Sequence, residues 1–467
     1  DLPDGIIKVC QQLATHLRER HPLFYRRTVD DTEGLLGDEV EVARAEDLGQ
    51  IDTFRFEEEK VLKEALAALG ASEWDIAAKW ASLRVGGNSI WLRERPERES
   101  AWQLLLAAAR LGQTIAAASG RLSDKEGLVG AMDHYVERGA AVDQAHRHLE
   151  QRRQALLYPQ VPEFETLRIR LDAMRAFWRS WADGWARDFN AHCKSHGFLP
   201  PTAQQQRTLF DDVVRPLCQQ SGPTAYFVID AFRFEMGAEL AERLRSPTAN
   251  VQLKARLAEL PTVTEVGMNV LAPVASNGKL RPVVQSGSIA GFQAGEFRVD
   301  DPKTRQRAMQ ERVGGSSCPL LTLSEVRQRD SASLKRTIAK ARLVLVHSQE
   351  LDTSGESGFG PAVFDGVMKD LVAAWQLLRE AGVRRFVFTG DHGFLLLDEH
   401  APIVQPHGRK VDPKRRHVLS PVAADHTGQV RVALADLGYE GCTDQLMLPE
   451  STALFDKGGR PPSFVHG

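Results

Sequence analysis

Apolar residues recur at helical spacing through the first two hundred residues of this 467-residue chain. The pattern is clearest over residues 59–70, 101–119 and 167–192, in stretches rich in Ala, Leu, Glu, Arg and Gln. Glycine and proline clusters separate these segments. The pattern predicts an all-helical domain over residues 1–200. This domain contains no motif that indicates catalysis.

One helix of this domain is predicted to carry a ladder of aromatic side chains. Phe177, Trp181, Trp185 and Phe189 follow one another at intervals of four, and Trp178 adjoins them. Residues four apart lie on the same face of a helix, so the ladder forms one aromatic stripe. Such a stripe is typical of core packing; the alternative is a docking face for a partner protein.

The pattern changes near residue 200, where short β-branched runs begin to alternate with helical stretches. Strands are predicted at 225–229, 251–257, 343–347 and 386–389, with an amphipathic helix at 363–380 that Gly382 closes. A strand, a helix and a strand in this order predict a parallel pair with a right-handed crossover. Further strands are predicted at 430–434 and 445–448. Residues 201–467 therefore read as an α/β domain.

Composition narrows the class of protein without naming a function. The chain has 42% hydrophobic and 26% charged residues and a formal net charge of -3, which are ordinary values for a globular protein. It contains no apolar run of ~20 residues and no signal peptide, so we expect a cytoplasmic protein without membrane contact. Its five cysteines form no C-x-x-C pair, which argues against a thiolate zinc site. The chain starts at Asp1 and stops at Gly467, and we expect it to be a fragment of a longer protein.

Acidic residues and histidines follow several predicted strands at the edge where open α/β sheets bind ligands. Asp230 directly follows an apolar strand, although an aspartate there can also cap the next helix. Asp391 and His392 stand between glycines after another strand. An adjacent Asp and His at such a turn can coordinate one metal ion; the alternative is a hydrogen-bonded surface pair.

A threonine and a second acidic pair complete the set of candidates. Thr264 follows Leu260-Pro261-Thr262-Val263 and could act as a nucleophile, although Thr262 and Glu265 also match a capping box. Asp352 and Glu356 lie four residues apart in a glycine-rich stretch that we expect to be a loop. Two such carboxylates can converge on a cation; without a metal the stretch is a flexible polar loop.

The order of these residues along the chain resembles that of the alkaline phosphatase superfamily. Pro261-Thr262-Val263-Thr264 looks like the P-T-x-T motif of its nucleotide pyrophosphatase/phosphodiesterase branch, whose second threonine is the nucleophile. Asp352-Thr353-Ser354-Gly355-Glu356 with Gly360-Pro361 looks like that branch's D-x-x-G-H and G-P, with Glu356 where the branch has a histidine. The C-x-P-x-R motif of sulfatases and the H-T-R-E motif of phosphomutases are absent from the sequence.

A closer resemblance is to the PglZ family of BREX-type phage-defence systems. It runs from about residue 223 to the end of the chain and rests on five motifs: Asp230-Ala231-Phe232-Arg233-Phe234-Glu235, Leu260-Pro261-Thr262 with Gly267-Met268, Asp352 with Gly355-Glu356, Asp391-His392-Gly393-Phe394, and Phe464-Val465-His466-Gly467. The resemblance implies a central, mostly parallel sheet flanked by helices.

The resemblance also implies two divalent metal ions and assigns their ligands. One ion is held by Asp230, Thr264, Asp391 and His392. The other is held by Asp352, Glu356 and a late histidine, for which His466 is preferred over His417; His347, His407 and His426 are weaker alternatives. A carboxylate at position 356 favours manganese or magnesium over zinc at the second ion.

The resemblance implies a metal-dependent phosphoester hydrolase, and phage defence favours a phosphodiesterase or nuclease acting on DNA. Thr264 would attack phosphorus, and Arg233 could stabilise the developing charge. The basic run Arg409, Lys410, Lys414, Arg415 and Arg416 could follow a nucleic-acid backbone, or it could be a solvated loop. The alternative function is a metal-containing scaffold that recruits a DNA methyltransferase and other BREX proteins.

Overall fold

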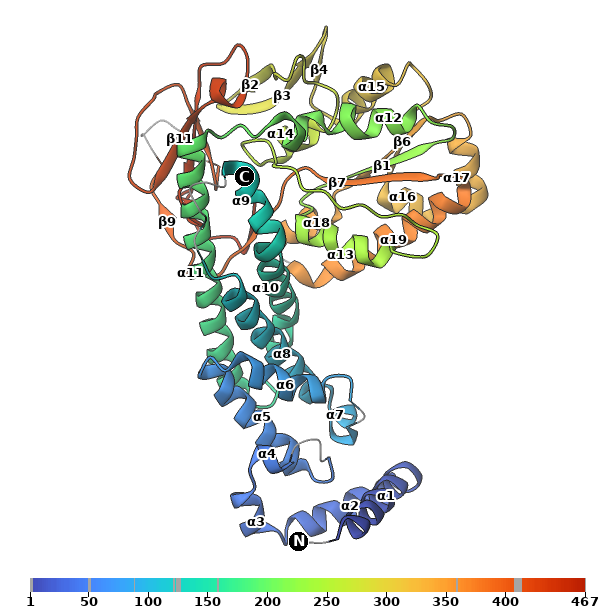
Figure 1. Cartoon of the computed structure of the whole chain (residues 1–467), viewed down its shortest axis with the longest axis vertical. Coiled ribbons are helices and arrows are strands. Elements are labelled where there is room, and N and C mark those ends of the chain that lie inside the picture. The colour runs from blue at the N-terminus through green and yellow to red at the C-terminus, as the bar shows by residue number, and fades with distance from the viewer. Residues whose placement is uncertain are drawn as a thin grey trace. The chain divides into compact units, whose positions relative to one another are not determined.

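The computed structural model divides into two compact units, each described by itself below (Figure 1). One unit contains residues 1–117 and 148–178, and the other contains residues 118–147 and 179–467. The boundary near residue 200 stays a prediction. His407, Arg409 and Lys410 lie outside the described part of the chain. The structure describes residues 3–48, 52–87, 89–120, 122, 127–157, 159–357, 360–406 and 414–466.

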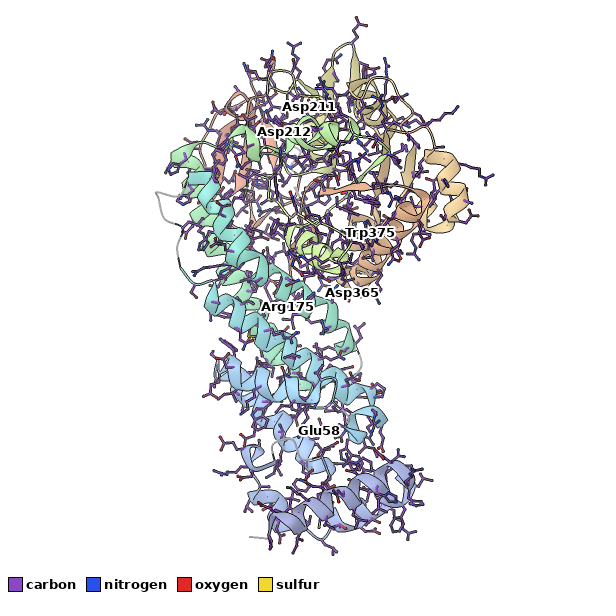
Figure 2. All side chains as sticks on the ribbon, turned by 45° about the vertical axis from the view of Figure 1, so that its right-hand side comes forward. Glu58, Arg175, Asp211, Asp212, Asp365 and Trp375 are labelled. Carbon is purple, nitrogen blue, oxygen red and sulfur yellow. The ribbon has the colours of Figure 1, made fainter. Side chains whose placement is uncertain are left out.

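Helices make up the first unit, as the sequence predicts. Their bounds are α1 (Asp4–Arg20), α2 (Pro22–Glu33), α3 (Gly37–Val42), α4 (Ala45–Leu48), α5 (Arg55–Gly70), α6 (Trp74–Arg84), α7 (Ile90–Glu94) and α8 (Pro96–Ala117). Glu58 of α5, labelled in Figure 2, is buried and accepts a hydrogen bond from Trp102 Nε1 at 2.6 Å. Arg98 of α8 pairs with the same carboxylate, so these helices share a buried polar contact as well as an apolar core.

The remaining helices before the sheet belong partly to each unit. They are α9 (Gly127–His134), the π-helical turn η1 (Tyr135–Gly139), α10 (Ala140–Arg152), η2 (Arg153–Leu157), α11 (Phe164–His196), η3 (Thr202–Gln204), η4 (Gln206–Thr208), η5 (Phe210–Val214) and α12 (Arg215–Cys218). The aromatic ladder lies on α11. Trp178 is buried, and Trp185 stacks on Phe189 with ring centroids 5.3 Å apart. These contacts support core packing, while Phe177 is 39% exposed.

A four-stranded parallel sheet forms the centre of the second unit, in the order β5-β6-β1-β7. The strands are β1 (Thr224–Ile229), β5 (Leu320–Thr322), β6 (Leu343–Ser348) and β7 (Arg385–Gly390). The predictions at 225–229, 343–347 and 386–389 are therefore confirmed. The predicted adjacency of the last two is wrong, because β1 lies between β6 and β7 and pairs with both.

Helices cover both faces of this sheet (Figure 1). Alternate side chains of β1 point to opposite faces, so Phe227 joins one apolar core and Tyr226 the other. The first core includes α13 (Phe234–Leu244), α16 (Leu323–Gln328), α17 (Ser331–Ile338) and α19 (Phe364–Ala381). The second includes α14 (Thr264–Val270) and α15 (Pro302–Arg312). The α/β fold class predicted from the sequence is confirmed.

Three local predictions differ from the structure. Residues 251–257 form no strand. Within this described stretch only Leu257 makes a bridge, to Gln205, and Leu253 is 43% exposed. The stretch around Asp352 is a helix, α18 (Glu350–Glu356), rather than a loop. Thr262 does not cap α14, because Val263 occupies the N-cap position and Thr264 is the first helical residue.

Short strands and turns complete the second unit. They are β2 (Pro282–Gln285), β3 (Ser288–Ala294), β4 (Phe297–Val299), η6 (Gly360–Val363), β8 (Leu395–Leu396), β9 (Ile403–Val404), β10 (Val418–Ser420), β11 (Gln429–Ala433), η7 (Leu434–Leu437), β12 (Gln445–Pro449), β13 (Leu454–Phe455) and β14 (Phe464–Val465). The predicted strands at 430–434 and 445–448 correspond to β11 and β12. Within the described ranges, no helix combines the length and apolar character that crossing a membrane requires.

Candidate metal centre

The first group of acidic and histidine side chains forms where β1 and β7 end side by side. Ile229 pairs with Gly390 at the last register position, so Asp230 and Asp391 leave adjacent parallel strands at the same edge. Both carboxylates are buried. Ala231, directly after Asp230, has a φ of 56°, an unusual conformation for a residue other than glycine that is often found at functional sites.

Hydrogen bonds from the backbone fix the orientation of Asp391. Its Oδ1 accepts from the backbone N–H of Ala231 at 3.0 Å and from that of His392 at 2.7 Å. Gln206 Nε2 donates to the carbonyl oxygens of Gly390 at 3.0 Å and of Asp391 at 2.7 Å. A side chain on Gly267 would overlap with the Asp391 carbonyl, which explains why glycine is needed there. Asp391 Oδ2 is consequently aimed away from these contacts.

His392 and Thr264 complete the first group. His392 Nε2 lies 3.5 Å from Asp230 Oδ1 and 3.3 Å from Asp391 Oδ2, while its Nδ1 lies 3.0 Å from the Gly393 carbonyl oxygen. Donation from Nδ1 to that carbonyl leaves Nε2 free to bind a metal. Thr264 Oγ1 lies 3.0 Å from His392 Nε2 and 3.5 Å from Asp230 Oδ1.

The second group comes from α18 and the end of the described chain. Asp352 and Glu356 lie one helical turn apart and both face His466. His466 Nε2 lies 3.6 Å from Asp352 Oδ1 and 3.3 Å from Glu356 Oε1. Ligand atoms of the three residues all lie within 4.8 Å of one another, as do those of Asp230, Asp391 and His392.

Strand pairing explains how residues more than a hundred positions apart meet. β14 pairs antiparallel with β8, so Val465 faces Leu395 and the chain delivers His466 beside the turn that follows β7. Phe464 stacks on Phe394 with centroids 4.7 Å apart. A side chain on Gly355 would overlap with the Phe464 ring, so glycine allows α18 to approach β14 closely.

The two groups are neighbours and together fit a pair of cations. The rings of His392 and His466 stack with centroids 4.6 Å apart. Asp391 Oδ2 and Asp352 Oδ1 are buried and make no hydrogen bond to any described residue. Because buried carboxylate oxygens nearly always have a partner, these two oxygens and the imidazole nitrogens beside them suit divalent metal ions.

Burial and mutual repulsion oppose charge on these carboxylates in the absence of a metal. Burial, together with the neighbouring charges of Asp391 and Asp352, raises the pKa of Asp230 to about 9. Burial also raises the pKa of Asp391 to about 7, against the lowering effect of its backbone hydrogen bonds. Burial and the nearby His466 lower the pKa of His392 to about 4, so this imidazole is neutral and able to bind a metal.

These shifts predict that the metal-free protein loses stability as pH rises. The folded state holds the Asp230 proton up to about pH 9, whereas the unfolded state releases it near about pH 3.9. This stabilisation is complete below the unfolded pKa and is lost as pH rises through the folded pKa. We expect the free energy of unfolding, measured with denaturant in the presence of a chelator, to fall by roughly 1 kcal/mol per pH unit between about pH 7 and about pH 8 through this residue, and by less per unit towards about pH 9. Asp230→Asn should remove that slope, and an unchanged slope would contradict the assignment.

Several residues considered from the sequence lie elsewhere. The Arg233 guanidinium donates to Glu235 Oε1, with Nε at 2.9 Å, and to the Asp143 carbonyl at 3.1 Å, so it is engaged away from the carboxylates of both groups. His417 is buried and lines a cleft next to the second group, described below, rather than belonging to that group. His347 is buried beside Arg305, and burial lowers its pKa to about 4.

The sequence did not point to three residues that lie near the site in the structure. Gln206 has no sequence signal that marks its contact with Asp391. Arg305 is buried and donates to Asn269 Oδ1 at 2.8 Å, and its charge interacts with those of Asp391 and Asp230. Glu265 was considered only as a capping residue, yet it is exposed and lines the cleft next to Thr264. Its position directly after the candidate nucleophile was the available signal.

A cleft of about 590 Å³ opens beside the second group. Gly355, Glu356 and His466 line one part of it, and Glu265 lines another. Its basic lining residues are Lys414, Arg415 and Lys457. A cavity of this volume accepts a ligand larger than a single phosphate ester.

A parallel sheet with helices on both faces and paired Asp/His groups at its carboxyl edge defines an alkaline-phosphatase-like domain. The model of the family described as "BREX system PglZ alkaline phosphatase-like domain" matches residues 209–467, and the chain belongs to this PglZ family. The "Alkaline phosphatase-like protein PglZ" of Bacillus cereus (strain H3081.97) is 20% identical over 279 residues. The match covers 56% of this chain but only 31% of that protein.

Proposed function

We propose that the chain is a metal-dependent phosphodiesterase with Thr264 as its nucleophile. The single observation that carries the proposal is the meeting of two adjacent ligand groups at one edge of the sheet, with a threonine hydroxyl at the first. Asp230, Thr264, Asp391 and His392 would hold one divalent ion, and Asp352, Glu356 and His466 the other. The ions are zinc or manganese, with magnesium as a third option.

The proposed reaction proceeds in two displacements at phosphorus. Thr264 Oγ1 loses its proton and forms a bond to phosphorus while the ester bond to the leaving oxygen breaks, and that oxygen takes up a proton. Water then attacks the phosphothreonine, releases a phosphomonoester and restores the hydroxyl. The bound ions supply Lewis acidity that lowers the pKa of oxygen nucleophiles and offsets negative charge. Asp230 and His392 orient the Thr264 hydroxyl through its contacts at 3.5 and 3.0 Å.

Charge at the site favours a diester over a monoester. The two ligand groups contain four carboxylates, which balance the four positive charges of two divalent ions. No positive charge is then left over to attract the second negative charge of a monoester dianion. Glu265 adds a further negative charge beside Thr264. Burial raises the pKa of Asp352, and the charges of Glu356 and Glu265 raise it further, which indicates that Glu265 acts on this site.

Glu265→Gln is therefore expected to relax the preference for diesters. Removal of the charge should increase kcat/KM for p-nitrophenyl phosphate by about three- to tenfold relative to kcat/KM for bis(p-nitrophenyl) phosphate. The exposed Glu296→Gln provides the matched control and should leave the ratio unchanged. An unchanged ratio in Glu265→Gln would rule out this role for Glu265.

Metal removal and return test the proposed activity. Protein treated with a chelator should not hydrolyse bis(p-nitrophenyl) phosphate, and added manganese or zinc should restore hydrolysis. Family membership supports an association with BREX systems, so we further propose a role in phage defence with a DNA phosphodiester substrate and a DNA methyltransferase among the partners. Bound metal without hydrolysis of either ester would favour the alternative of a metal-containing assembly scaffold.

A further inference from the structure

We propose that Lys414, Arg415 and Lys457 form a second phosphate-binding subsite, so that the substrate is an extended phosphodiester chain of the polynucleotide type. This inference rests on the proposed function and specifies the substrate class of the same site. All three residues line the cleft that also contains Glu356 and His466 of the second ligand group. An anion in the cleft could therefore contact the ions and the basic residues at the same time.

Hydrogen bonds between two distant segments bring the basic residues together. The Phe455 N–H donates to the Arg415 carbonyl at 2.8 Å, and Arg415 Nη2 donates to the Gly458 carbonyl at 3.2 Å. Lys457 lies between these two contact points along the chain. The subsite therefore has a defined backbone frame, although its members are separated by about forty positions in the sequence.

The neighbouring arginine provides an internal comparison. Arg416 points inward, donates to the carbonyls of Ser451 at 2.7 Å and Ala453 at 2.6 Å, and has a pKa lowered to about 10 by burial. Lys414, in contrast, is exposed, and Arg415 is partly exposed. The Arg416 side chain is therefore engaged in structural hydrogen bonds, while the charges of Lys414 and Arg415 are open to a ligand in the cleft.

The basic residues form no ion pair with a carboxylate in the described part of the chain. Asp456 is close enough to Arg415 for the charge of Arg415 to help lower the pKa of that carboxyl, after the hydrogen bonds from Gly458 and Gln405. The nearest acidic neighbour in sequence, Asp456, accepts from the Gly458 N–H at 2.8 Å and from Gln405 Nε2 at 2.9 Å. Three unpaired cations beside a balanced metal centre favour a substrate whose flanking phosphates, rather than its scissile one, supply the extra negative charge.

A charge-neutralised triple variant, Lys414→Gln/Arg415→Gln/Lys457→Gln, tests the subsite. With manganese-loaded protein, KM for a short single-stranded DNA oligonucleotide should rise at least about tenfold at moderate salt. Oligonucleotide binding is measured by fluorescence anisotropy in a Thr264→Ala background at several salt concentrations. The slope of log binding constant against log salt concentration should be smaller in magnitude by about two in the triple variant. Hydrolysis of bis(p-nitrophenyl) phosphate, which has no flanking phosphate, should stay within about twofold of the parent.

Lys335→Gln/Arg336→Gln/Lys340→Gln is the matched control, because it removes the same charge from exposed positions on and beside α17. This control should leave the KM for the oligonucleotide, the hydrolysis of bis(p-nitrophenyl) phosphate and the salt dependence of binding unchanged. Equal oligonucleotide KM values for the cleft variant and the parent, or equal losses in the cleft and control variants, would overturn the subsite while the proposed activity stands. Absence of hydrolysis of every ester would instead overturn the proposed activity, and the binding slope would still decide the subsite.

Discussion

Replacement of Thr264 by alanine should reduce hydrolysis of bis(p-nitrophenyl) phosphate by at least about a thousandfold. The variant loses the oxygen that forms the bond to phosphorus, while Asp230, Asp391 and His392 keep the positions that their own contacts define. Thr264→Ser retains an attacking hydroxyl and should keep a measurable part of the activity. The measurement is kcat with saturating manganese or zinc for all three proteins.

Thr262→Ala is the matched control for this prediction. It removes a threonine hydroxyl two positions away on the segment that leads into α14, and it should change kcat by no more than about twofold. Asp230, Asp391 and His392 remain as proposed ligands in the Thr264→Ala variant, so it should still bind metal at saturating concentration. Its metal content is measured alongside kcat to separate a loss of rate from a loss of cofactor. Undiminished hydrolysis in Thr264→Ala would exclude this residue as the nucleophile.

Replacement of Asp391 by asparagine should abolish metal binding at the buried group and lower activity by at least about a hundredfold. The amide oxygen can still accept the hydrogen bonds from the Ala231 and His392 backbone that Oδ1 accepts. An amide NH₂, however, replaces Oδ2, the oxygen that makes no hydrogen bond to a described residue. A donor in that position repels a cation instead of binding it.

Metal-dependent stabilisation provides a readout of this change that does not depend on turnover. A bound ion at a hundred times its Kd stabilises a protein by about 2.7 kcal/mol, so the parent should show a clear increase in Tm on metal addition. We expect Asp391→Asn to lose most of that increase. Asp365→Asn, an exposed change on α19 (Figure 2), should keep it. Equal increases in Asp391→Asn and the parent would contradict the assignment.

The fold of the second unit was largely predictable because its central strands are long and apolar. β1 follows Gly222-Pro223 and β7 follows Gly382, and each of the three strands β1, β6 and β7 ends next to a polar residue. β5 escaped prediction because three residues are too few to show a period. The order of the strands in the sheet could not be predicted from the hydrophobic pattern either. β1 lies between β6 and β7, and this order depends on packing rather than on local sequence.

The sequence named the residues that the structure brings together in the two candidate groups, but it did not give their geometry. Parallel strands that end at one edge predict that Asp230 and Asp391 meet. His466 lies far from both in the sequence, and only the pairing of β14 with β8 brings it to Asp352 and Glu356. The expected loop at Asp352 is a helix because Leu351 is fully buried and fixes the turn against the core.

Residues whose role depends on tertiary contacts could not be predicted from the sequence. Gln206 reaches the carbonyls of Gly390 and Asp391 from a short helical turn almost two hundred positions earlier. The segment that carries Lys457 is held to Arg415 by hydrogen bonds of Phe455 and Gly458, and no sequence motif marks these contacts. Arg233 differs from these residues. Its position near Asp230 in the sequence suggested that it stabilises charge at the reacting phosphate, but in the structure its guanidinium pairs with Glu235.

Anomalous scattering from crystals of metal-loaded protein tests the central claim most directly. Two peaks per chain are expected, one bounded by Asp230, Asp391, His392 and Thr264 and the other by Asp352, Glu356 and His466. Peaks at other side chains, or full metal loading with neither position occupied, would contradict the account.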